Sequence, residues 1–255
     1  MKHLFISDVH LGAFESPVNQ KIEDDLCGLI DHCKSENIQI HLLGDLFDYW
    51  MEYPNMHPLI GETVLSAFAS YNKTVAPITY ITGNHDNWTF GYFEELGFKV
   101  EPDFNKITID DKNFFLHHGD GMSHKNAGLL RPFFHRILRN KYFINLYQFL
   151  FPPKMGLKIM KWFSNVNRKR PIEDPEPLNV WSENFLEHHP IDFLICGHDH
   201  IPRIETFSFG TYINLGTFFQ HRTVALYTNS QCKLVSWDGT AKVFKPFTDD
   251  KTAKE

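Results

Sequence analysis

Short apolar runs and amphipathic helical patterns alternate along most of the chain. The runs have the length of buried strands and are closely followed by Asp, Asn or Gly; they cover residues 3–7, 38–43, 78–81 and 193–196. Apolar positions spaced three and four apart predict helices over residues 23–34, 61–71 and 180–188. Strands interleaved with helices predict an α/β fold.

Two further segments show the alternation typical of β-structure. Residues 106–117 predict a hairpin that turns at Asp110-Asp111, and residues 204–237 predict a β-meander. Hairpins added to strand–helix units give a fold class of α/β (α+β layers), in which helices flank two packed β-sheets. The polar tail, residues 248–255, is expected to fray.

One segment differs from the rest of the chain in charge. Residues 122–170 contain 11 of the 25 Lys and Arg and none of the 31 Asp and Glu, although the net charge is −6. Nine aromatic residues lie in the same segment. Basic and aromatic side chains gathered in an otherwise acidic protein suit an anionic membrane surface or an anionic amphiphile. The alternative is a helical hairpin whose lysines are only solvated.

The pattern within this basic segment is helical. Apolar residues share one helix face and basic residues another: Leu130, Phe133, Phe134, Ile137 and Leu138, against Arg131, His135 and Arg139. This run is expected to end at Phe151-Pro152-Pro153, since consecutive prolines cannot continue a helix. A second amphipathic helix is expected from Met155 to Val166. The predicted division is a core, residues 1–121 and 175–247, and a helical insertion, residues 122–174.

Composition narrows the class of protein. With 42% hydrophobic and 22% charged residues, the chain resembles an ordinary globular domain. The four cysteines form no C-x-x-C pair and predict the reduced thiols of a cytosolic protein. The first residues are too polar for a signal peptide, and no run approaches the about 18 apolar residues of a membrane span. Fifteen histidines are a first sign of metal or proton chemistry.

Polar motifs follow the ends of the predicted strands. They are Asp8-Val9-His10, Gly44-Asp45-Leu46-Phe47-Asp48, Gly83-Asn84-His85-Asp86, His118-Gly119-Asp120 and Gly197-His198-Asp199-His200. Loops at the carboxyl ends of neighbouring strands gather on one side of an open α/β sheet. Carboxylate, imidazole and amide groups suit Mn²⁺, Fe²⁺ or Zn²⁺. The sequence therefore predicts one site for two divalent cations, with Asp45 on a central strand as the candidate bridge.

The motifs D-x-H, G-D-x-x-D, G-N-H-D, H-G-D and G-H-x-H, in this order, resemble those of the calcineurin-like metallophosphoesterases. They extend from residue 8 to residue 200, so the resemblance covers most of the chain. It implies a β-sandwich flanked by helices and two divalent metal ions, Mn²⁺ first, with Fe²⁺ and Zn²⁺ as alternatives. It also implies the ligands of each metal: Asp8, His10, Asp45 and His200 for one, and Asp45, Asn84, His118 and His198 for the other.

Two neighbouring motifs supply the candidate catalytic residues. His85 follows Asn84 and can donate a hydrogen bond or a proton to the leaving group. Asp48 can orient and charge that imidazole, as the Asp–His pair of the family does. His117 is assigned to packing or to contact with the metal ligands from behind, because adjacent residues of a strand point to opposite faces. Three histidines match no motif and are expected to be structural or exposed: His57, His124 and His188.

Among metallophosphoesterases, the chain is most similar to the bacterial UDP-2,3-diacylglucosamine hydrolases of lipid A synthesis. The similarity rests on the motif of residues 44–50, on the insertion directly after His118-Gly119-Asp120, and on the motif of residues 214–217. It implies hydrolysis of a pyrophosphate to UMP and 2,3-diacylglucosamine 1-phosphate, with the insertion as a lid over acyl chains. Known members have Arg in place of His85 and often Glu in place of Asp48, which indicates a divergent branch.

The similarity also gives the partner and the residues that would contact it. The implied partner is an anionic acylated nucleotide sugar, and the insertion would contact an anionic membrane surface. A cytoplasmic location, peripheral on the inner face of the cytoplasmic membrane, follows. The candidate substrate-binding residues are Asn84, His85, Asn126, Ser164, Asn167, Arg168, Lys169 and His198.

Three other functions compete with this interpretation. The enzymatic alternative is a soluble phosphodiesterase that acts on nucleotides or other small diesters. A scaffold that has lost its metals is disfavoured, because all seven candidate ligands are present. Nucleic acid is not an expected partner, since the chain outside the insertion is acidic and contains no recognised nucleic-acid motif.

Overall fold

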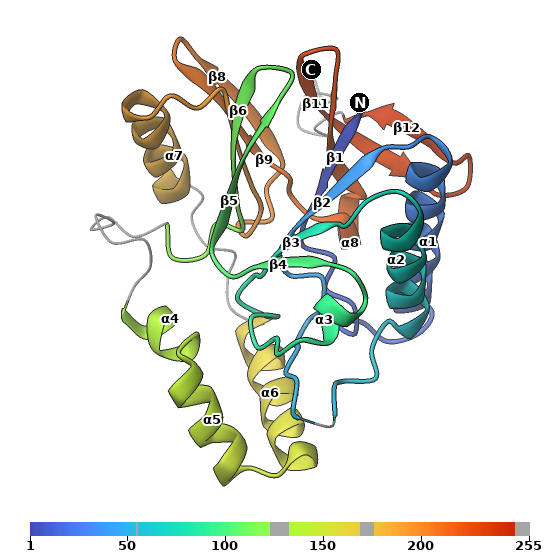
Figure 1. The fold of residues 1–255 in the computed structure, drawn as a ribbon, viewed down its shortest axis with the longest axis vertical. Helices are drawn as coiled ribbons and strands as arrows, with labels where there is room; N and C mark the ends of the chain where they lie inside the picture. The colour runs from blue at the N-terminus through green and yellow to red at the C-terminus, as the bar shows by residue number, and fades with distance from the viewer. Residues whose placement is uncertain (55, 123–132, 169–175, 248–255) are drawn as a thin grey trace, which may run out of the picture.

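Two β-sheets pack face to face in this protein, with helices on their outer faces and three helices below (Figure 1). The computed structural model describes residues 1–54, 56–122, 133–168 and 176–247, with the backbone alone for residues 133–135, 165–168 and 176. This arrangement confirms the predicted α/β sandwich.

The larger sheet has seven strands and begins the fold. Its strands are β1 (His3–Ile6), β2 (Gln39–Leu43), β3 (Thr79–Ile81), β4 (Lys99–Glu101), β10 (Thr223–Thr228), β11 (Gln231–Asp238) and β12 (Val243–Pro246). They lie in the order β12-β11-β10-β1-β2-β3-β4, and β1 to β4 run parallel to one another. The carboxyl ends of these four strands therefore lie on the same side of the sheet.

The smaller sheet has five strands. They are β5 (Phe104–Ile109), β6 (Lys112–His117), β7 (Phe193–Cys196), β8 (Arg203–Phe207) and β9 (Gly210–Asn214), in the order β5-β6-β7-β9-β8. The predicted hairpin is present, because β5 and β6 pair through a turn in which Asp110 and Asp111 both have positive φ. Since β6 and β7 are parallel, their carboxyl ends also lie together.

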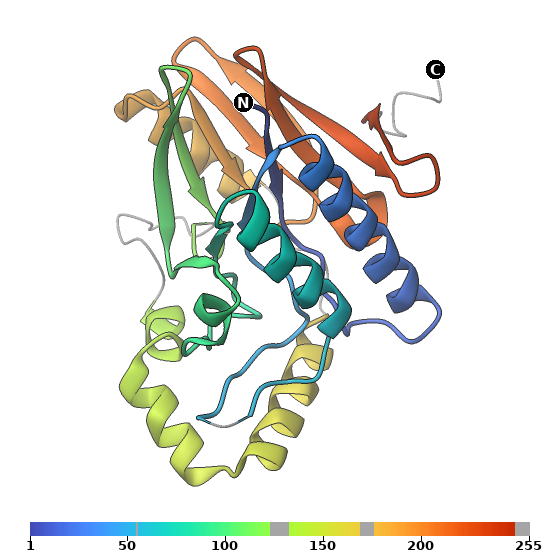
Figure 2. The ribbon, with the colours of Figure 1, turned by 45° about the vertical axis from the view of Figure 1, so that its right-hand side comes forward.

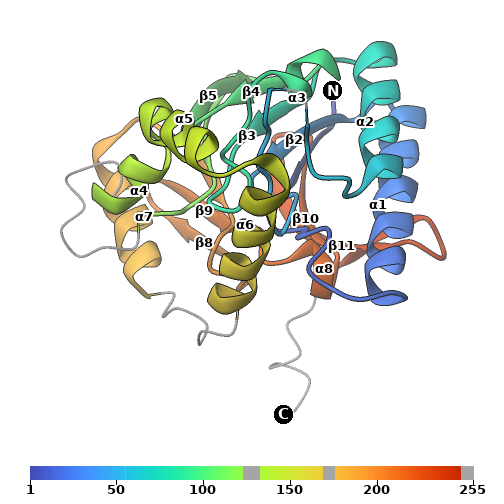
Figure 3. The same ribbon diagram turned by 90° about the horizontal axis from the view of Figure 1, so that it is seen from below.

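Helices cover the outer faces and the lower end of the sheets. Those on the outer faces include α1 (Val18–Ser35), α2 (Glu62–Thr74) and α7 (Glu176–His188), and two short ones are α3 (Tyr92–Glu95) and α8 (Phe218–His221). Figure 2 shows α1 and α2 in front of the larger sheet. Three helices lie below: α4 (Phe133–Leu138), α5 (Lys141–Leu150) and α6 (Pro153–Arg168), and from below they stand in front of the sheets (Figure 3). They fall within the predicted insertion, whose boundaries remain a prediction.

Both faces of the central strands are buried. Phe5 of β1 packs between the two sheets, where its ring centroid lies 5.8 Å from that of Phe114 in β6. Leu4 and Ile6 point to the other face and join the core under α1 and α2. Burial on both faces explains why the sequence of these strands is a continuous apolar run and does not alternate.

The elements agree with the sequence patterns in type and differ at their boundaries. The helix expected from residue 23 begins at Val18, and the one expected from residue 180 begins at Glu176. The short elements α3 and β4, of four and three residues, were not predicted. Segments of this length carry too few positions for a period to be recognised.

The predicted continuous meander over residues 204–237 is wrong. Strands β8 and β9 belong to the smaller sheet, whereas β10 and β11 belong to the larger one. The chain crosses between the sheets through α8, where the N–H of Phe218 donates to the carbonyl oxygen of Asp8 at 3.1 Å. Alternation identifies which side chains are buried but contains no information about the sheet that a strand joins.

The predicted helical run up to residue 151 is also interrupted. Helix α4 ends at Leu138, and Asn140 caps α5, because its side-chain oxygen accepts from the N–H groups of Tyr142 and Phe143 at 2.9 and 3.4 Å. The break before α6 is present as predicted, and Pro153 is its first residue. Among the described residues, no helix combines the length and the apolar character needed to cross a bilayer.

Candidate metal centre

The main chain turns sharply after the central strands. Five residues that are not glycine adopt positive φ angles here: Asp8 (50°), His10 (51°), Asp45 (53°), His198 (76°) and His200 (64°). Such angles are uncommon for residues with a Cβ atom and concentrate at functional sites. The sequence motifs had marked all five residues from their chemistry, and the backbone marks them again.

Main-chain hydrogen bonds hold these turns together. The N–H groups of Val9 and His10 both donate to the carbonyl oxygen of Asp45, at 2.9 and 3.0 Å. The N–H of His198 donates to Oδ2 of Asp8 at 3.1 Å, and thereby joins the smaller sheet to the larger. The loops after β1, β2 and β7 therefore form one rigid edge.

One group of side chains gathers around Asp8. Oδ1 of Asp8 lies 3.2 Å from Nε2 of His200 and 3.7 Å from Nε2 of His10, and the two imidazole nitrogens are 3.3 Å apart. A carboxylate oxygen and two imidazole nitrogens thus point to a single small volume. This is a donor set that a divalent transition metal accepts.

A second group adjoins the first through Asp45. Oδ2 of Asp45 lies 3.7 Å from Nε2 of His10 and 3.3 Å from Nε2 of His118. Nε2 of His118 is in turn 3.1 Å from Oδ1 of Asn84. One oxygen of Asp45 therefore faces both groups, which is the position that a bridging carboxylate needs.

The donor atoms fit metal ions in chemistry and in spacing. Three overlapping triads have ligand atoms within 4.8 Å of one another: Asp8, His10 and His200; His10, Asp45 and His85; and Asp8, Asp45 and His118. Nδ1 of His118 donates to the carbonyl oxygen of Leu43 at 2.8 Å, which fixes the ring with Nε2 toward the cluster. The ring of His198 lies 5.2 Å from that of His118, beside this cluster.

Burial and charge act in opposition on the two carboxyl groups. Burial by itself would raise the pKa of Asp45, but the charges of His118 and His85 and the hydrogen bond from His118 hold it well below its usual range. Burial opposes in the same way at Asp8, where hydrogen bonds with His10 and His200 lower the pKa. Both carboxyl groups are therefore ionised and available as ligands.

The imidazoles respond to the same arrangement. Burial disfavours the charged form of His118, yet the charge of Asp45 and its hydrogen bond raise the pKa to about 10. Burial lowers the pKa of His198 to about 4, with the charge of His118 acting in the same direction. These carboxylates stabilise positive charge at this edge, whether it is carried by a proton or by a metal.

Glycines allow the strand-end loops to approach so closely. A Cβ atom on Gly83 would overlap Oδ1 and the main-chain nitrogen of Asp45, and one on Gly197 would overlap Oδ2 of Asp8. Gly83 directly precedes Asn84, and Gly197 directly precedes His198. The glycines in the motifs are therefore required by contact with the ligands.

Asp86 had no predicted role, yet its side chain holds the loops that carry Asp45 and Asn84 in place. Its buried carboxylate accepts from the N–H of Leu46 (2.7 Å), the N–H of Gly83 (2.7 Å) and the hydroxyl of Tyr80 (2.5 Å). These bonds connect the loop of Asp45 with the loop of Asn84. The fixed place of Asp86 after His85 in the G-N-H-D motif was the available signal.

His85 and Asp48 lie together, but the contact differs from the expected one. Nδ1 of His85 donates to the main-chain carbonyl of Asp48 at 2.6 Å, so Asp48 orients the ring through its backbone. The carboxylate of Asp48 accepts from the hydroxyl of Ser164 at 2.7 Å and lies 3.9 Å from Nδ1 of His10. The hydrogen bond between the two residues therefore uses the main chain of Asp48, and the expected role of its carboxylate stays a prediction.

The candidate substrate-binding residues fall into three groups. Asn84, His85 and His198 lie at the cluster. Ser164 is buried against Asp48. Asn167 and Arg168 belong to the last turn of α6, where only the backbone is described. Asn126 and Lys169 lie outside the described residues, as does His124.

The remaining histidines of the motif analysis have packing contacts. His117 packs edge-on against Trp181 of α7, with ring centroids 5.2 Å apart. His188 lies exposed at the end of α7, and its ring bonds to the carbonyl of Asn184. His57 stacks on Tyr92 with ring centroids 3.9 Å apart.

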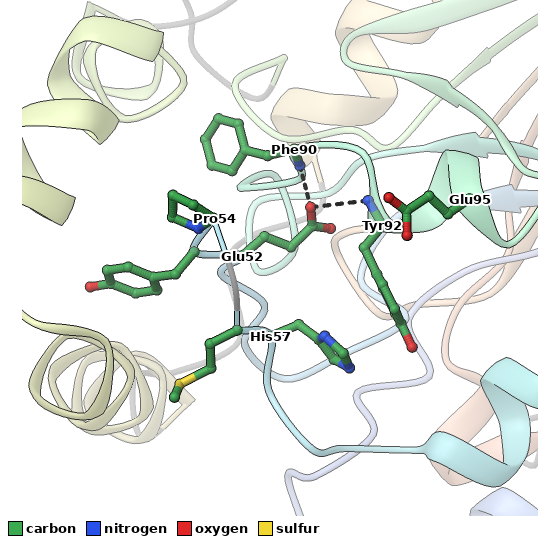
Figure 4. Close-up of a pocket in the computed structure, with 8 residues that line it drawn as sticks. Glu52, Pro54, His57, Phe90, Tyr92 and Glu95 are labelled. Atoms are coloured by element: carbon green, nitrogen blue, oxygen red, sulfur yellow. Dashed lines mark hydrogen bonds between the residues drawn. The ribbon is translucent and has the colours of Figure 1, made fainter.

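A separate pocket beside the loop after β2 has the wrong charge for a phosphate (Figure 4). The carboxylate of Glu52 accepts from the N–H groups of Phe90 and Tyr92, at 2.5 and 3.3 Å. Two carboxylates and no Lys or Arg are among the described lining residues: Glu52, Tyr53, Pro54, Met56, His57, Phe90, Tyr92 and Glu95. Because like charges repel and no described Lys or Arg lines this pocket, it is not a candidate site for a phosphate.

A family model named calcineurin-like phosphoesterase matches residues 1–202. The chain belongs to this family, and with its Asp/His clusters it is a metal-dependent phosphoesterase.

Two relatives with the name UDP-2,3-diacylglucosamine hydrolase align with most of this chain. The UDP-2,3-diacylglucosamine hydrolase of Porphyromonas gingivalis is 25% identical, and the alignment covers 97% of this chain and 98% of that protein. The enzyme of the same name from Hamiltonella defensa is 28% identical over 80% of this chain and 79% of that protein.

Two solved structures also resemble this chain in the arrangement of the backbone. An archaeal phosphodiesterase is 17% identical, with a TM-score of 0.49 over 92% of this chain and 98% of that chain. The phosphoesterase Yfce from E. coli is 14% identical, with a TM-score of 0.48 over 96% of each chain.

Proposed function

We propose that the cluster holds two divalent metal ions, Mn²⁺ first, with Fe²⁺ and Zn²⁺ as alternatives. The first metal would take its ligands from Asp8, His10, Asp45 and His200, and the second from Asp45, Asn84, His118 and His198. The shared oxygen of Asp45 between His10 and His118 supports this division. When bound, two such ions activate a water molecule and neutralise the charge of a phosphate.

The protein itself would contribute orientation and a proton donor. Asn84 and His85 follow β3 directly, and the N–H of His85 donates to Oδ1 of Asp45 at 3.0 Å, which fixes the backbone of the motif. The contact from Nδ1 to the carbonyl of Asp48 leaves Nε2 of His85 as the free position of the ring for a leaving-group oxygen. With a proton on Nε2 as well as on Nδ1, His85 is the candidate general acid.

We propose further that the substrate is UDP-2,3-diacylglucosamine, cleaved to UMP and 2,3-diacylglucosamine 1-phosphate. The observation that carries this proposal is the basic, apolar insertion joined to the cluster through the bond between Ser164 and Asp48. The length over which the chain aligns with relatives of that name supports it as well. A substrate with two phosphates and two acyl chains requires cationic and apolar surfaces side by side.

The exposed face of the insertion has this double character. Helix α5 exposes an apolar stripe at helical spacing, and α6 exposes aromatic side chains: Tyr142, Leu146, Phe149 and Leu150, with Trp162 and Phe163. Phe149 is 85% exposed and Trp162 is 65% exposed, which is unusual for side chains of this size. Lys154, Lys158 and Lys161 are exposed on α6. We propose that this face contacts an anionic membrane on the cytoplasmic side.

The second candidate is a phosphodiesterase for nucleotides or other small diesters. The metal cluster and His85 would serve it equally well, because neither depends on the insertion for its donor atoms. The exposed apolar stripe of α5 disfavours it, since a small polar substrate has no use for such a surface.

The experiment incubates the purified protein and Mn²⁺ with UDP-2,3-diacylglucosamine in detergent micelles and measures UMP by chromatography. Bis(p-nitrophenyl) phosphate serves as the small diester, and the variant Asp45→Asn controls for contaminating enzymes. UMP from the wild type and none from the variant is the expected result. Turnover of the small diester without UMP would select the second candidate, and turnover of neither would reject both.

A further inference from the structure

One arginine of the insertion reaches into the edge of the sheets. Arg139 follows the last residue of α4 and precedes Asn140, the cap of α5. The sequence pattern placed it on a basic helix face with Arg131 and His135. The structure instead turns its side chain toward the core, where only 11% of it is exposed.

The guanidinium binds the loop that carries Asn84. Nη2 donates to the carbonyl oxygen of Gly83 at 2.7 Å and to that of Thr82 at 3.3 Å, and Nη1 donates to the hydroxyl of Thr82 at 2.9 Å. Gly83 is the residue directly before Asn84. Arg139 therefore fixes the main chain at the base of a candidate metal ligand.

The same guanidinium also binds the loop that follows His118. Nη2 lies 3.2 Å from Oδ2 of Asp120, whose side chain is fully buried. Asp120 belongs to the smaller sheet's strand-end loop, whereas Gly83 belongs to the larger sheet's. A further bond, from Nη1 to the carbonyl of Pro102 at 2.8 Å, holds the connection between β4 and β5.

We propose that Arg139 is a positioning residue that sets the separation of Asn84 and His118 and thereby the affinity of the second metal site. This inference rests on the proposed function, because it assigns Asn84 and His118 to one metal. Oδ1 of Asn84 and Nε2 of His118 are 3.1 Å apart, and Arg139 joins the two loops that carry them. The first site, with Asp8, His10 and His200, lies on loops that Arg139 does not join.

Only a planar fork can make these contacts together. A guanidinium presents five N–H donors in fixed directions, whereas the ammonium group of Lys is a single centre on a flexible stem. Removing Arg139 would take the guanidinium contact at 3.2 Å away from the buried carboxylate of Asp120. Residues that orient metal ligands in this indirect way typically change metal affinity by about 10–100-fold when they are replaced.

Through Arg139, the position of the insertion would also affect metal binding. Because Arg139 lies between α4 and α5, a ligand that shifts these helices would shift the loops of Asn84 and His118 as well. Coupling of this kind is reciprocal, so the factor by which an acylated substrate changes the affinity for the second metal equals the factor by which that metal changes the affinity for the substrate.

The test measures Mn²⁺ binding by calorimetric titration of the metal-free wild type, Arg139→Ala, Arg139→Lys and Arg136→Ala. Arg136 is exposed on α4 and is the matched control. We expect two Mn²⁺ ions to bind the wild type and the control. In both Arg139 variants we expect one of the two binding steps to lose about 10–100-fold in affinity while the other stays unchanged. Added guanidinium ion should restore part of that affinity to Arg139→Ala.

Each other outcome has a separate meaning. Two Mn²⁺ ions bound with wild-type affinity by Arg139→Ala would overturn the inference and leave the proposed function standing. An equal loss at both sites, without rescue by guanidinium, would also overturn it, because it would show a general loss of structure. If Arg139→Ala does not fold, the same comparison of Mn²⁺ affinities is made with Arg139→Lys, and wild-type affinity at both sites would again overturn the inference. A wild type that binds no Mn²⁺ would reject the proposed function itself.

Discussion

The hydroxyl of Ser164 donates a 2.7 Å hydrogen bond to the carboxylate of Asp48, although 116 residues separate the two in sequence. Ser164 lies in α6 of the insertion, and Asp48 lies in the loop after β2 that also carries Asp45. Both side chains are buried. The insertion is therefore fastened to the edge of the sheets within reach of the candidate metal ligands.

Replacing Ser164 tests whether this residue stabilises the fold through Asp48 or contacts the substrate, as its sequence position suggested. We expect Ser164→Ala to lower the free energy of unfolding by about 1–3 kcal/mol, because the buried Asp48 carboxylate loses a donor. Urea denaturation measures this, with Ser66→Ala on the exposed face of α2 as the control. A rise in KM for the acylated substrate with unchanged stability would favour direct substrate contact instead.

Two glycine substitutions should differ in effect: one should abolish metal binding, and the other should raise the stability of the fold. In Gly83→Ala the new Cβ overlaps Oδ1 and the main chain of Asp45, so we expect loss of Mn²⁺ binding and of activity. In Gly28→Ala, within α1, the nearest atom lies 3.9 Å away on Trp237, so the methyl group fits. The second change should stabilise the protein by about 0.5–1 kcal/mol, since glycine weakens a helix interior.

Calorimetric metal titration and urea denaturation on the two variants check this pair. If Gly83→Ala bound two Mn²⁺ ions with unchanged affinity, the close approach of the strand-end loops would not be required for the site.

Turnover should depend on His85 more strongly than metal binding does. We expect His85→Ala to lower kcat by roughly 10²–10⁴-fold, the range of acid–base contributions, while two metal ions remain bound. The measurement is steady-state kinetics together with the metal content of the same sample. His188→Ala, at the exposed end of α7, is the control. Full turnover in His85→Ala would exclude the leaving-group role.

A histidine far from the cluster should make stability depend on pH. His41 of β2 is buried, and its ring stacks on Phe5 with centroids 4.9 Å apart. Burial, with the charge of His3 as a second cause, lowers the pKa of His41 from 6.5 to about 3. Between these values the unfolded chain binds a proton that the folded state does not, so stability falls as pH falls from 6.5 toward 3.

Urea denaturation at pH 7 and pH 5 measures this contribution. Between pH 7 and pH 5, titration of His41 should lower the free energy of unfolding of the wild type by about 2 kcal/mol. In His41→Phe the decrease over the same interval should be smaller by that amount. An identical drop in the two proteins would show that His41 titrates normally in the folded state.

The parallel strands and the polar motifs after them were predictable, because both depend on local patterns. Phe5 and Leu43 belong to apolar runs, and Asp8 and Asp45 follow such runs directly. Convergence at one edge is then a consequence of parallel strand direction. These positions require no knowledge of the rest of the fold.

Contacts between distant segments were not predictable from those patterns. Arg139 matches a basic helix face in sequence, and only the tertiary fold turns it toward Gly83 and Asp120. The strands over residues 204–237 alternate correctly, but alternation does not assign β8 and β10 to different sheets. The break at Asn140 is local and was not predicted, although Asn before a helical run is a recognisable start signal.

The proposed metal centre requires two metal ions that share the oxygen of Asp45 at the edge of the sheets. Anomalous diffraction from a crystal grown with Mn²⁺ is the decisive measurement, because the peaks locate the metals without reference to activity. We predict two peaks about 3.5–4 Å apart. One should lie among Asp8, His10 and His200 and the other beside Asn84 and His118. Anomalous peaks at other positions, or none at this edge, would show that the Asp/His cluster does not hold a pair of metal ions.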